Sequence, residues 1–192
     1  AGDPDALVFS GRCVPYGEAN PWWPIADALR DGCGIEADQT LLSAREAAGR
    51  AVRDVGVDVD AETEMVNGLL HMMGYDGPLR GLEPARARAE STQSLLAFME
   101  ASVRRRSIVV RLADLHWADD VVLDLIDNMT DQLAREPFVL VGTARPTLLE
   151  RWSPRAGRHN VTVLTVDPLD RSASSALLDA LVDEVPAGLR ET

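Results

Sequence analysis

Short apolar runs alternate with helical patterns in the second half of the chain, and this alternation limits the folds open to it. Residues 107–114, SIVVRLAD, and residues 137–145, PFVLVGTAR, have the length and composition of buried strands. Between them, residues 119–135 repeat apolar side chains at helical spacing. Strands and helices that alternate in this way predict an α/β fold, a parallel sheet with helices on both faces.

The complete pattern predicts four strands, at residues 6–12, 107–113, 138–143 and 161–166. A long and mainly helical segment, residues 22–105, separates the first strand from the second. A helix follows the fourth strand, with Asp170 as its N-cap. We therefore expect one partial α/β core over residues 1–192.

Charge and cysteine content restrict the partners and the compartment. The chain has 192 residues, enough for one domain, and a formal net charge of −12. Such a surface repels phosphate groups, so we expect neither direct nucleic-acid binding nor membrane binding. Cys13 and Cys33 form no C-x-x-C pair and are expected to be free thiols. With no signal sequence and no long apolar run, a cytoplasmic protein is predicted.

Candidate site residues lie where the predicted strands end, because ligands of open parallel sheets bind at the carboxyl ends of the strands. Three places qualify: Ala113–Asp114, Thr143–Arg145 and Asp167–Pro168. In the first, an apolar strand leads to Asp114, and LHWAD then leads directly into a helix.

The run SIVVRLADLHWADD (residues 107–120) resembles the Walker B segment of P-loop NTPases of the AAA and STAND signalling classes. The closest similarity is to the ATPase domains of LuxR-type and SARP-type regulators and of proteins associated with actinobacterial cyclases. Residues 10–30 resemble the second strand of that family and its following helix, residues 141–150 its sensor strand, and residues 161–181 its last core strand and the entry to its helical lid. Four segments in family order indicate the family, with residues 168–192 as the start of the lid.

The resemblance implies a site for ATP and Mg²⁺ in the full-length protein. Asp114 takes the place of the Walker B acid that orients water and helps to hold the metal. Arg145 takes the place of the arginine that faces the γ-phosphate, with Thr143 beside it at the strand end. Pro168 lies at the corner that is near the adenine base in the family.

Two departures from the family bear on catalysis. No G-x-x-x-x-G-K-[ST] loop occurs in these residues, and we expect it to lie ahead of residue 1, outside this chain. The first acid of the Walker B pair is replaced by Ala113, which should weaken metal binding. Arg111 is also unusual inside a strand that is expected to be buried. We therefore expect no bound nucleotide and no hydrolysis in this chain.

Each candidate also has a structural interpretation. Asp114 can bind backbone amides at a strand end, and Arg145 can pair with a surface carboxylate. Thr143 can be an ordinary strand-end hydroxyl, and Pro168 can set the turn into the lid helix.

Three residues of the LHWAD segment favour the structural interpretation. Asp119 is expected to be the N-cap of the next helix. His116 and Trp117 are expected to be packing residues, since no clustered partners suggest a zinc site.

The function favoured by the sequence is a nucleotide-switch domain in a signalling or transcriptional regulator, acting on other domains of the parent chain. The alternative is a non-catalytic scaffold or interaction domain that kept the NTPase architecture. The missing phosphate-loop strand would lie between the sensor strand and the last core strand. Its loss predicts a gap with unpaired backbone groups. Water, direct pairing of the flanking strands, or self-association with a neighbouring chain must supply their hydrogen bonds.

Overall fold

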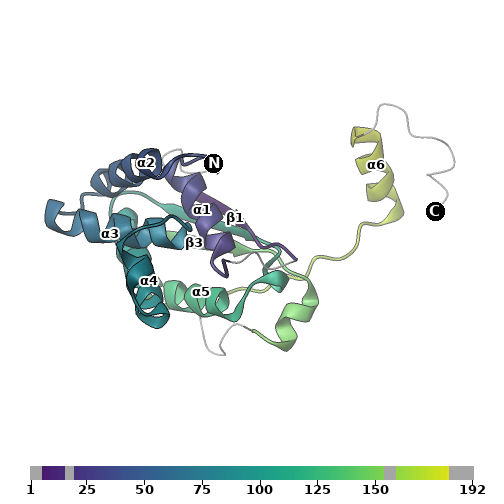
Figure 1. The fold of residues 1–192 in the computed structure, drawn as a ribbon. Coiled ribbons are helices and arrows are strands. Elements are labelled where there is room, and N and C mark those ends of the chain that lie inside the picture. Colours follow the sequence, from purple (N-terminus) through teal and green to yellow (C-terminus); the bar gives the residue numbers. More distant parts are fainter. Residues whose placement is uncertain (1–5, 16–19, 154–158, 182–192) are drawn as a thin grey trace. The chain divides into compact units, whose positions relative to one another are not determined.

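A computed structural model describes residues 6–15, 20–153 and 159–181. The chain divides into two compact units, residues 1–160 and 161–192, and each is considered by itself. The first unit holds the sheet and most of the helices (Figure 1).

Three parallel strands form the sheet of the first unit. They are β1 (Leu7–Arg12), β2 (Ile108–Ala113) and β3 (Phe138–Gly142), in the order β1-β2-β3 with β2 in the centre. The three strands begin in register, because Ile108 pairs with Leu7 on one side and with Phe138 on the other. These three strand predictions are confirmed to within one residue at each end.

The fourth predicted strand is wrong. Residues 161–166 belong to the second unit and pair with no strand in the described part of the chain. Val163, Leu164 and Val166 are all exposed there. The alternation of apolar side chains was suited to a strand, but a strand also needs a neighbour whose backbone accepts and donates its hydrogen bonds.

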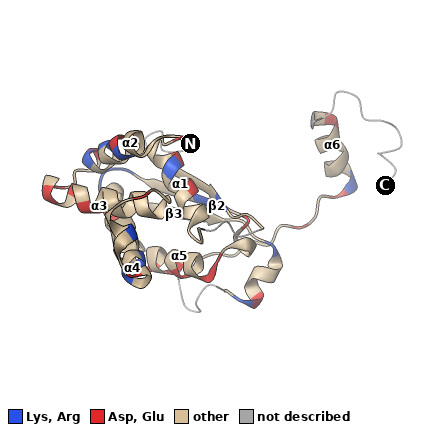
Figure 2. Cartoon of the chain, viewed as in Figure 1, with Lys and Arg blue, Asp and Glu red and all other residues tan. Residues whose placement is uncertain are grey.

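The helical segment between β1 and β2 is confirmed and contains four helices, followed by two more after β2. Their bounds are α1 Trp23–Cys33, α2 Leu41–Asp54, α3 Val59–Met72, α4 Pro84–Val103, α5 Asp120–Gln132 and α6 Arg171–Leu181. Three short 3-10 helices connect them, at Pro78–Gly81, Leu115–Trp117 and Pro146–Glu150. Acidic and basic residues are interspersed along α2 and α4 (Figure 2).

Side-chain caps fix the start of several helices. The Asp119 carboxylate accepts a hydrogen bond from the Val121 N–H at 3.1 Å, at the start of α5. Asp170 accepts one from the Ala173 N–H at 2.7 Å, at the start of α6. Both N-cap predictions are confirmed, and each cap satisfies an amide that the helix itself leaves unpaired.

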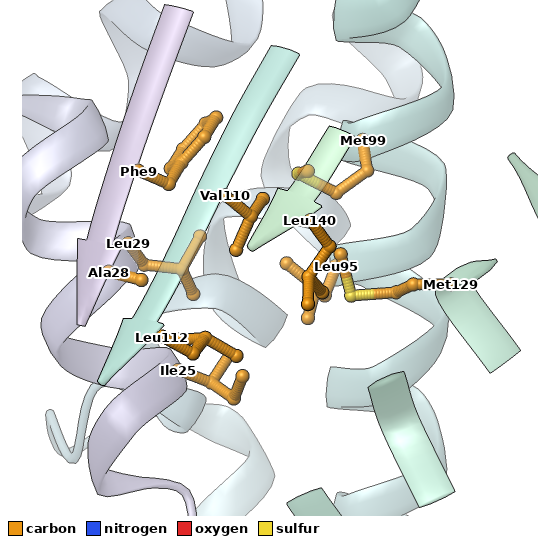
Figure 3. A pocket seen from close by; sticks show the side chains of 10 residues that line it. All are labelled: Phe9, Ile25, Ala28, Leu29, Leu95, Met99, Val110, Leu112, Met129 and Leu140. Carbon is orange, nitrogen blue, oxygen red and sulfur yellow. The ribbon is translucent and has the colours of Figure 1, made fainter. Parts of the chain in front are cut away.

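One face of the sheet packs against α1, α4 and α5. Phe9 of β1 meets Phe98 of α4 edge to face, with ring centroids 6.3 Å apart. Between the sheet and these helices remains a cavity of about 20 Å³ (Figure 3). Its lining is apolar and comes from all three strands and all three helices: Phe9, Ile25, Ala28, Leu29, Leu95, Met99, Val110, Leu112, Met129 and Leu140.

Helix α1 approaches β1 closely at two glycines. A Cβ atom on Gly11 would lie 2.0 Å from the Pro24 carbonyl oxygen, and one on Gly32 would lie 2.1 Å from the Phe9 ring. Only glycine fits at either position without a shift of the backbone or the ring. The pair therefore fixes how α1 lies on the strand that precedes it.

The opposite face of the sheet, which we call the open face, is not covered by any helix among the described residues of the first unit. The side chains on this face come from alternate strand positions, Val8, Ser10, Arg12, Val109, Arg111, Ala113, Val139 and Val141. Val8 is 39% exposed, Val139 54% and Val141 49%. The prediction of helices on both faces is therefore wrong for this part of the chain, because apolar strands alone do not show which face is covered.

Arg111 lies on the open face and not in the core, which removes the difficulty of a buried arginine. Its Nη2 and Nε atoms donate to the Ser10 hydroxyl of β1 at 2.7 and 3.2 Å.

None of the described helices has the length and apolar character that a membrane crossing requires.

Candidate functional site at the carboxyl ends of the strands

The carboxyl ends of the three strands are joined by backbone hydrogen bonds. Cys13 N–H, after β1, donates to the Ala113 carbonyl at 2.9 Å. After β3, the Thr143 N–H donates to the Leu112 carbonyl at 3.0 Å, and the Thr143 carbonyl accepts from the Leu115 N–H at 2.9 Å. The segments that follow the three strands therefore lie side by side, as the parallel register requires.

Asp114 follows the central strand in a left-handed conformation, with φ 60° and ψ 38°. No other non-glycine residue in the described part of the chain has a positive φ. Aspartate tolerates this region better than most residues, and the conformation ends the strand abruptly and starts the 3-10 turn Leu115–Trp117. The turn leaves the Asp114 carboxylate partly exposed at the sheet edge.

Two neighbours hold Asp114. Its N–H donates to the Thr143 hydroxyl at 3.3 Å, and its carboxylate Oδ2 lies 3.7 Å from Nε of Arg12. Arg12 is the last residue of β1 and pairs in register with Ala113. An arginine thus stands beside Ala113, the position where the resemblance implies the first acid of the pair.

Arg145 is brought to the same edge by its backbone. Its N–H lies 3.4 Å from Nδ1 of His116, and its guanidinium lies 5.9 Å from the centroid of the Trp117 ring. No carboxylate partner of Arg145 is found among the described residues. The guanidinium therefore lies over an aromatic face, an arrangement that leaves its N–H donors available.

His116 and Trp117 differ in their surroundings. The His116 Nε2 atom is buried and has no hydrogen-bond partner among the described residues. Its ring centroid lies 5.0 Å from that of Trp117, which is 45% exposed. The packing interpretation suits His116, whereas Trp117 presents much of its ring at the surface beside Arg145.

Sequence reasoning missed two arginines at this edge, Arg12 and Arg151. Arg151 donates to the Asp120 carboxylate at 2.8 Å and to the Ala118 carbonyl, so it ties the turn after β3 to the start of α5. Arg12 is the last residue of β1 and lies in the first segment that resembles the family. Its place at a strand end could have identified it as a candidate site residue.

The charges at this edge also affect the buried thiol of Cys13. Its pKa is raised to about 11, first by burial and then by the negative charge of Asp114, while the positive charge of Arg151 acts in the opposite direction. The thiol is therefore protonated and unreactive at neutral pH. Both cysteines are free, as expected.

The structure brings Asp114, Thr143 and Arg145 together, whereas Pro168 lies in the second unit and its role stays a prediction. In the described part of the chain, no three His, Cys, Asp or Glu side chains gather closely enough to hold a metal ion. Among the described residues, the carboxylates at the strand ends include Asp114, paired with Arg12, and Asp27, which accepts from the Arg12 N–H at 3.2 Å. Those of Asp119 and Asp120 bind the start of α5 and Arg151.

Comparison with known proteins assigns no family. No protein-family model matches the chain, and no solved structure matches it significantly. Among curated proteins, an uncharacterized protein of Rhizobium meliloti (strain 1021) is 29% identical over 170 residues. These residues are 88% of this chain but 16% of that protein, so the chain spans a small part of the relative's length.

Proposed function

We propose that this chain is part of an ATP-binding regulatory switch in a signalling or transcriptional regulator. The observation that carries the proposal is the position of Asp114 at the carboxyl end of the central parallel strand, held by Thr143 and flanked by Arg12. Carboxyl ends of parallel strands are where open α/β sheets bind ligands, and nucleotides are frequent among them. The resemblance of residues 107–120 to a Walker B segment supports the same assignment.

Arg145 supports the choice of a phosphate ligand. Guanidinium groups bind phosphate oxygens through two parallel N–H donors, and the Arg145 guanidinium has no carboxylate partner in the described part of the chain. The half-exposed ring of Trp117 beneath it gives this edge a flat apolar surface as well.

The unpaired edge of β3 supports a larger domain in the intact protein. Among the described residues β3 pairs only with β2, and its other edge has no neighbouring strand. In the proposed domain a strand leading to the phosphate-binding loop occupies this edge and comes from outside residues 1–192. The greater length of the Rhizobium relative agrees with such a context. Other domains of the same polypeptide would receive the signal, in the cytoplasm.

The rival function is a non-catalytic interaction domain. Ala113 favours it, because the side chain that would complete the acidic pair is absent. The open face favours it too, because uncovered valines on a parallel sheet are suited to contact with another protein surface. In that case Asp114 and Arg145 would serve the local structure alone.

A nucleotide-binding titration of the intact gene product decides between the two. A fluorescent ATP analogue should bind, and Asp114→Asn and Arg145→Ala should each weaken binding about tenfold, as expected for lost charge-assisted contacts. Asp124→Asn and Arg88→Ala serve as matched controls, since both residues are exposed on helices α5 and α4. A protein that binds no nucleotide, or variants that bind as tightly as their controls, would leave the interaction domain as the function. Residues 1–192 alone should not hydrolyse ATP.

A further inference from the structure

The residues at the strand ends do not suit a divalent cation. Mg²⁺ prefers several oxygen ligands at short and regular distances. Ala113 offers none, and Asp119 and Asp120 are already bound to the start of α5 and to Arg151. Asp27 is bound to the Arg12 N–H at 3.2 Å. Asp114 remains, and its carboxylate faces the guanidinium of Arg12.

Arg12 stands where it can replace the charge of a metal. Its Cα is the register partner of Ala113, so its side chain leaves the sheet beside the position of the missing acid. Its Nε lies 3.7 Å from Asp114 Oδ2, and the side chain is 70% exposed. An exposed ion pair of this kind contributes about 1 kcal/mol or less, so sharing the Arg12 donors between the carboxylate and an incoming phosphate costs little.

A second guanidinium follows β3, the strand on the other side of the central strand β2. Arg145 follows β3 and is fixed at its backbone by His116, with the guanidinium over Trp117. Arg151 cannot serve in the same way, because it is bound to Asp120 and to the Ala118 carbonyl. Among the described residues, Arg12 and Arg145 are therefore the cations at this edge that can turn to an incoming anion.

We propose that this site binds the phosphates of a nucleotide without a divalent cation, with Arg12 and Arg145 supplying the positive charge. The proposal rests on the nucleotide-binding function inferred above and adds that this binding needs no divalent cation. Arginine remains charged at any physiological pH, and its planar donors match phosphate oxygens. Asp114 then orients Arg12 and does not act as a metal ligand.

The test compares binding of the fluorescent ATP analogue to the intact gene product in EDTA and in millimolar Mg²⁺. The dissociation constant should agree within about twofold between the two conditions, while Arg12→Gln should weaken binding in EDTA about tenfold. Ala113→Asp restores the first acid of the pair and should make binding depend on Mg²⁺. Wild-type binding that tightens tenfold or more with Mg²⁺ would overturn the metal-free site and leave the nucleotide function intact. No binding in either condition would overturn both.

Mn²⁺ binding to residues 1–192, followed by electron paramagnetic resonance, gives a readout independent of nucleotide. The wild-type chain should leave Mn²⁺ free in solution, and Ala113→Asp should bind it. Ala113 lies on the open face, so the added carboxylate has room, and circular dichroism checks that the variant is folded. Tight Mn²⁺ binding by the wild-type chain that Asp114→Asn abolishes would contradict the proposal.

Discussion

The Thr143 hydroxyl accepts a hydrogen bond from the Asp114 N–H at 3.3 Å and so joins the end of β3 to the end of β2. Thr143→Val keeps the shape of the side chain but removes the acceptor. We expect this variant to unfold about 1 kcal/mol more easily, the usual net contribution of one hydrogen bond. Urea denaturation measures the loss, and Thr143→Ser should restore most of the stability. Equal losses in both variants would mean that the hydroxyl does not hold Asp114.

The left-handed backbone at Asp114 predicts how substitutions there change stability, whatever their effect on nucleotide binding. Asp114→Gly removes the steric cost of φ 60° and should leave the melting temperature unchanged or higher, while Asp114→Val should lower stability by about 1–2 kcal/mol. Asp114→Asn retains a residue that tolerates this conformation and should melt like the wild type. Thermal denaturation of the three variants tests the order, and a stable Asp114→Val would contradict the backbone assignment.

Alkaline pH should destabilise the protein through its two thiols. The pKa of Cys13 is raised to about 11 and that of Cys33 to about 12, from an ordinary value of 9.0. Between pH 9 and 11 the unfolded chain therefore loses these protons before the folded chain does, and the free energy of unfolding falls. The slope is at most about 1.4 kcal/mol per pH unit for each thiol.

All 19 basic residues other than histidine are arginine, so no lysine titrates in the same range. The two tyrosines do titrate there, and the cysteine variants separate the contribution of the thiols from theirs. Unfolding by urea at pH 8, 9 and 10 measures the slope, and replacing Cys13 and Cys33 by alanine should flatten it. An unchanged slope in the double variant would mean that the burial of the thiols does not govern the alkaline response.

One edge of β3 has no neighbouring strand in the described part of the chain, and it predicts self-association of residues 1–192. Its exposed valines and free backbone groups can pair with the same edge of a second copy. Sedimentation should show dimers that increase with concentration, and Val141→Lys should shift the chain to monomers. Val59→Lys, at the exposed first residue of helix α3, is the matched control. A wild-type chain that remains monomeric at high concentration would contradict the prediction.

Local pattern was sufficient to predict three strands and the caps at Asp119 and Asp170, because both depend on neighbours in sequence. Residues 161–166 have the same local pattern, but pairing depends on a partner strand that the described chain does not supply. The ion pair between Arg12 and Asp114 depends on the register of β1 against β2, which cannot be predicted from local sequence. For the same reason, the sequence could not show that Arg111 and its neighbours lie on an uncovered face.

The close contact between α1 and β1 also provides a way to find distant relatives of this chain. Gly11 and Gly32 accept no larger side chain, whereas the apolar residues around them can change together and still fill the core. A related protein should therefore keep a glycine inside its first strand and a second one near the end of the next helix, even when little other identity remains. Candidates with bulky residues at both positions cannot form this strand–helix pair and can be set aside from sequence alone.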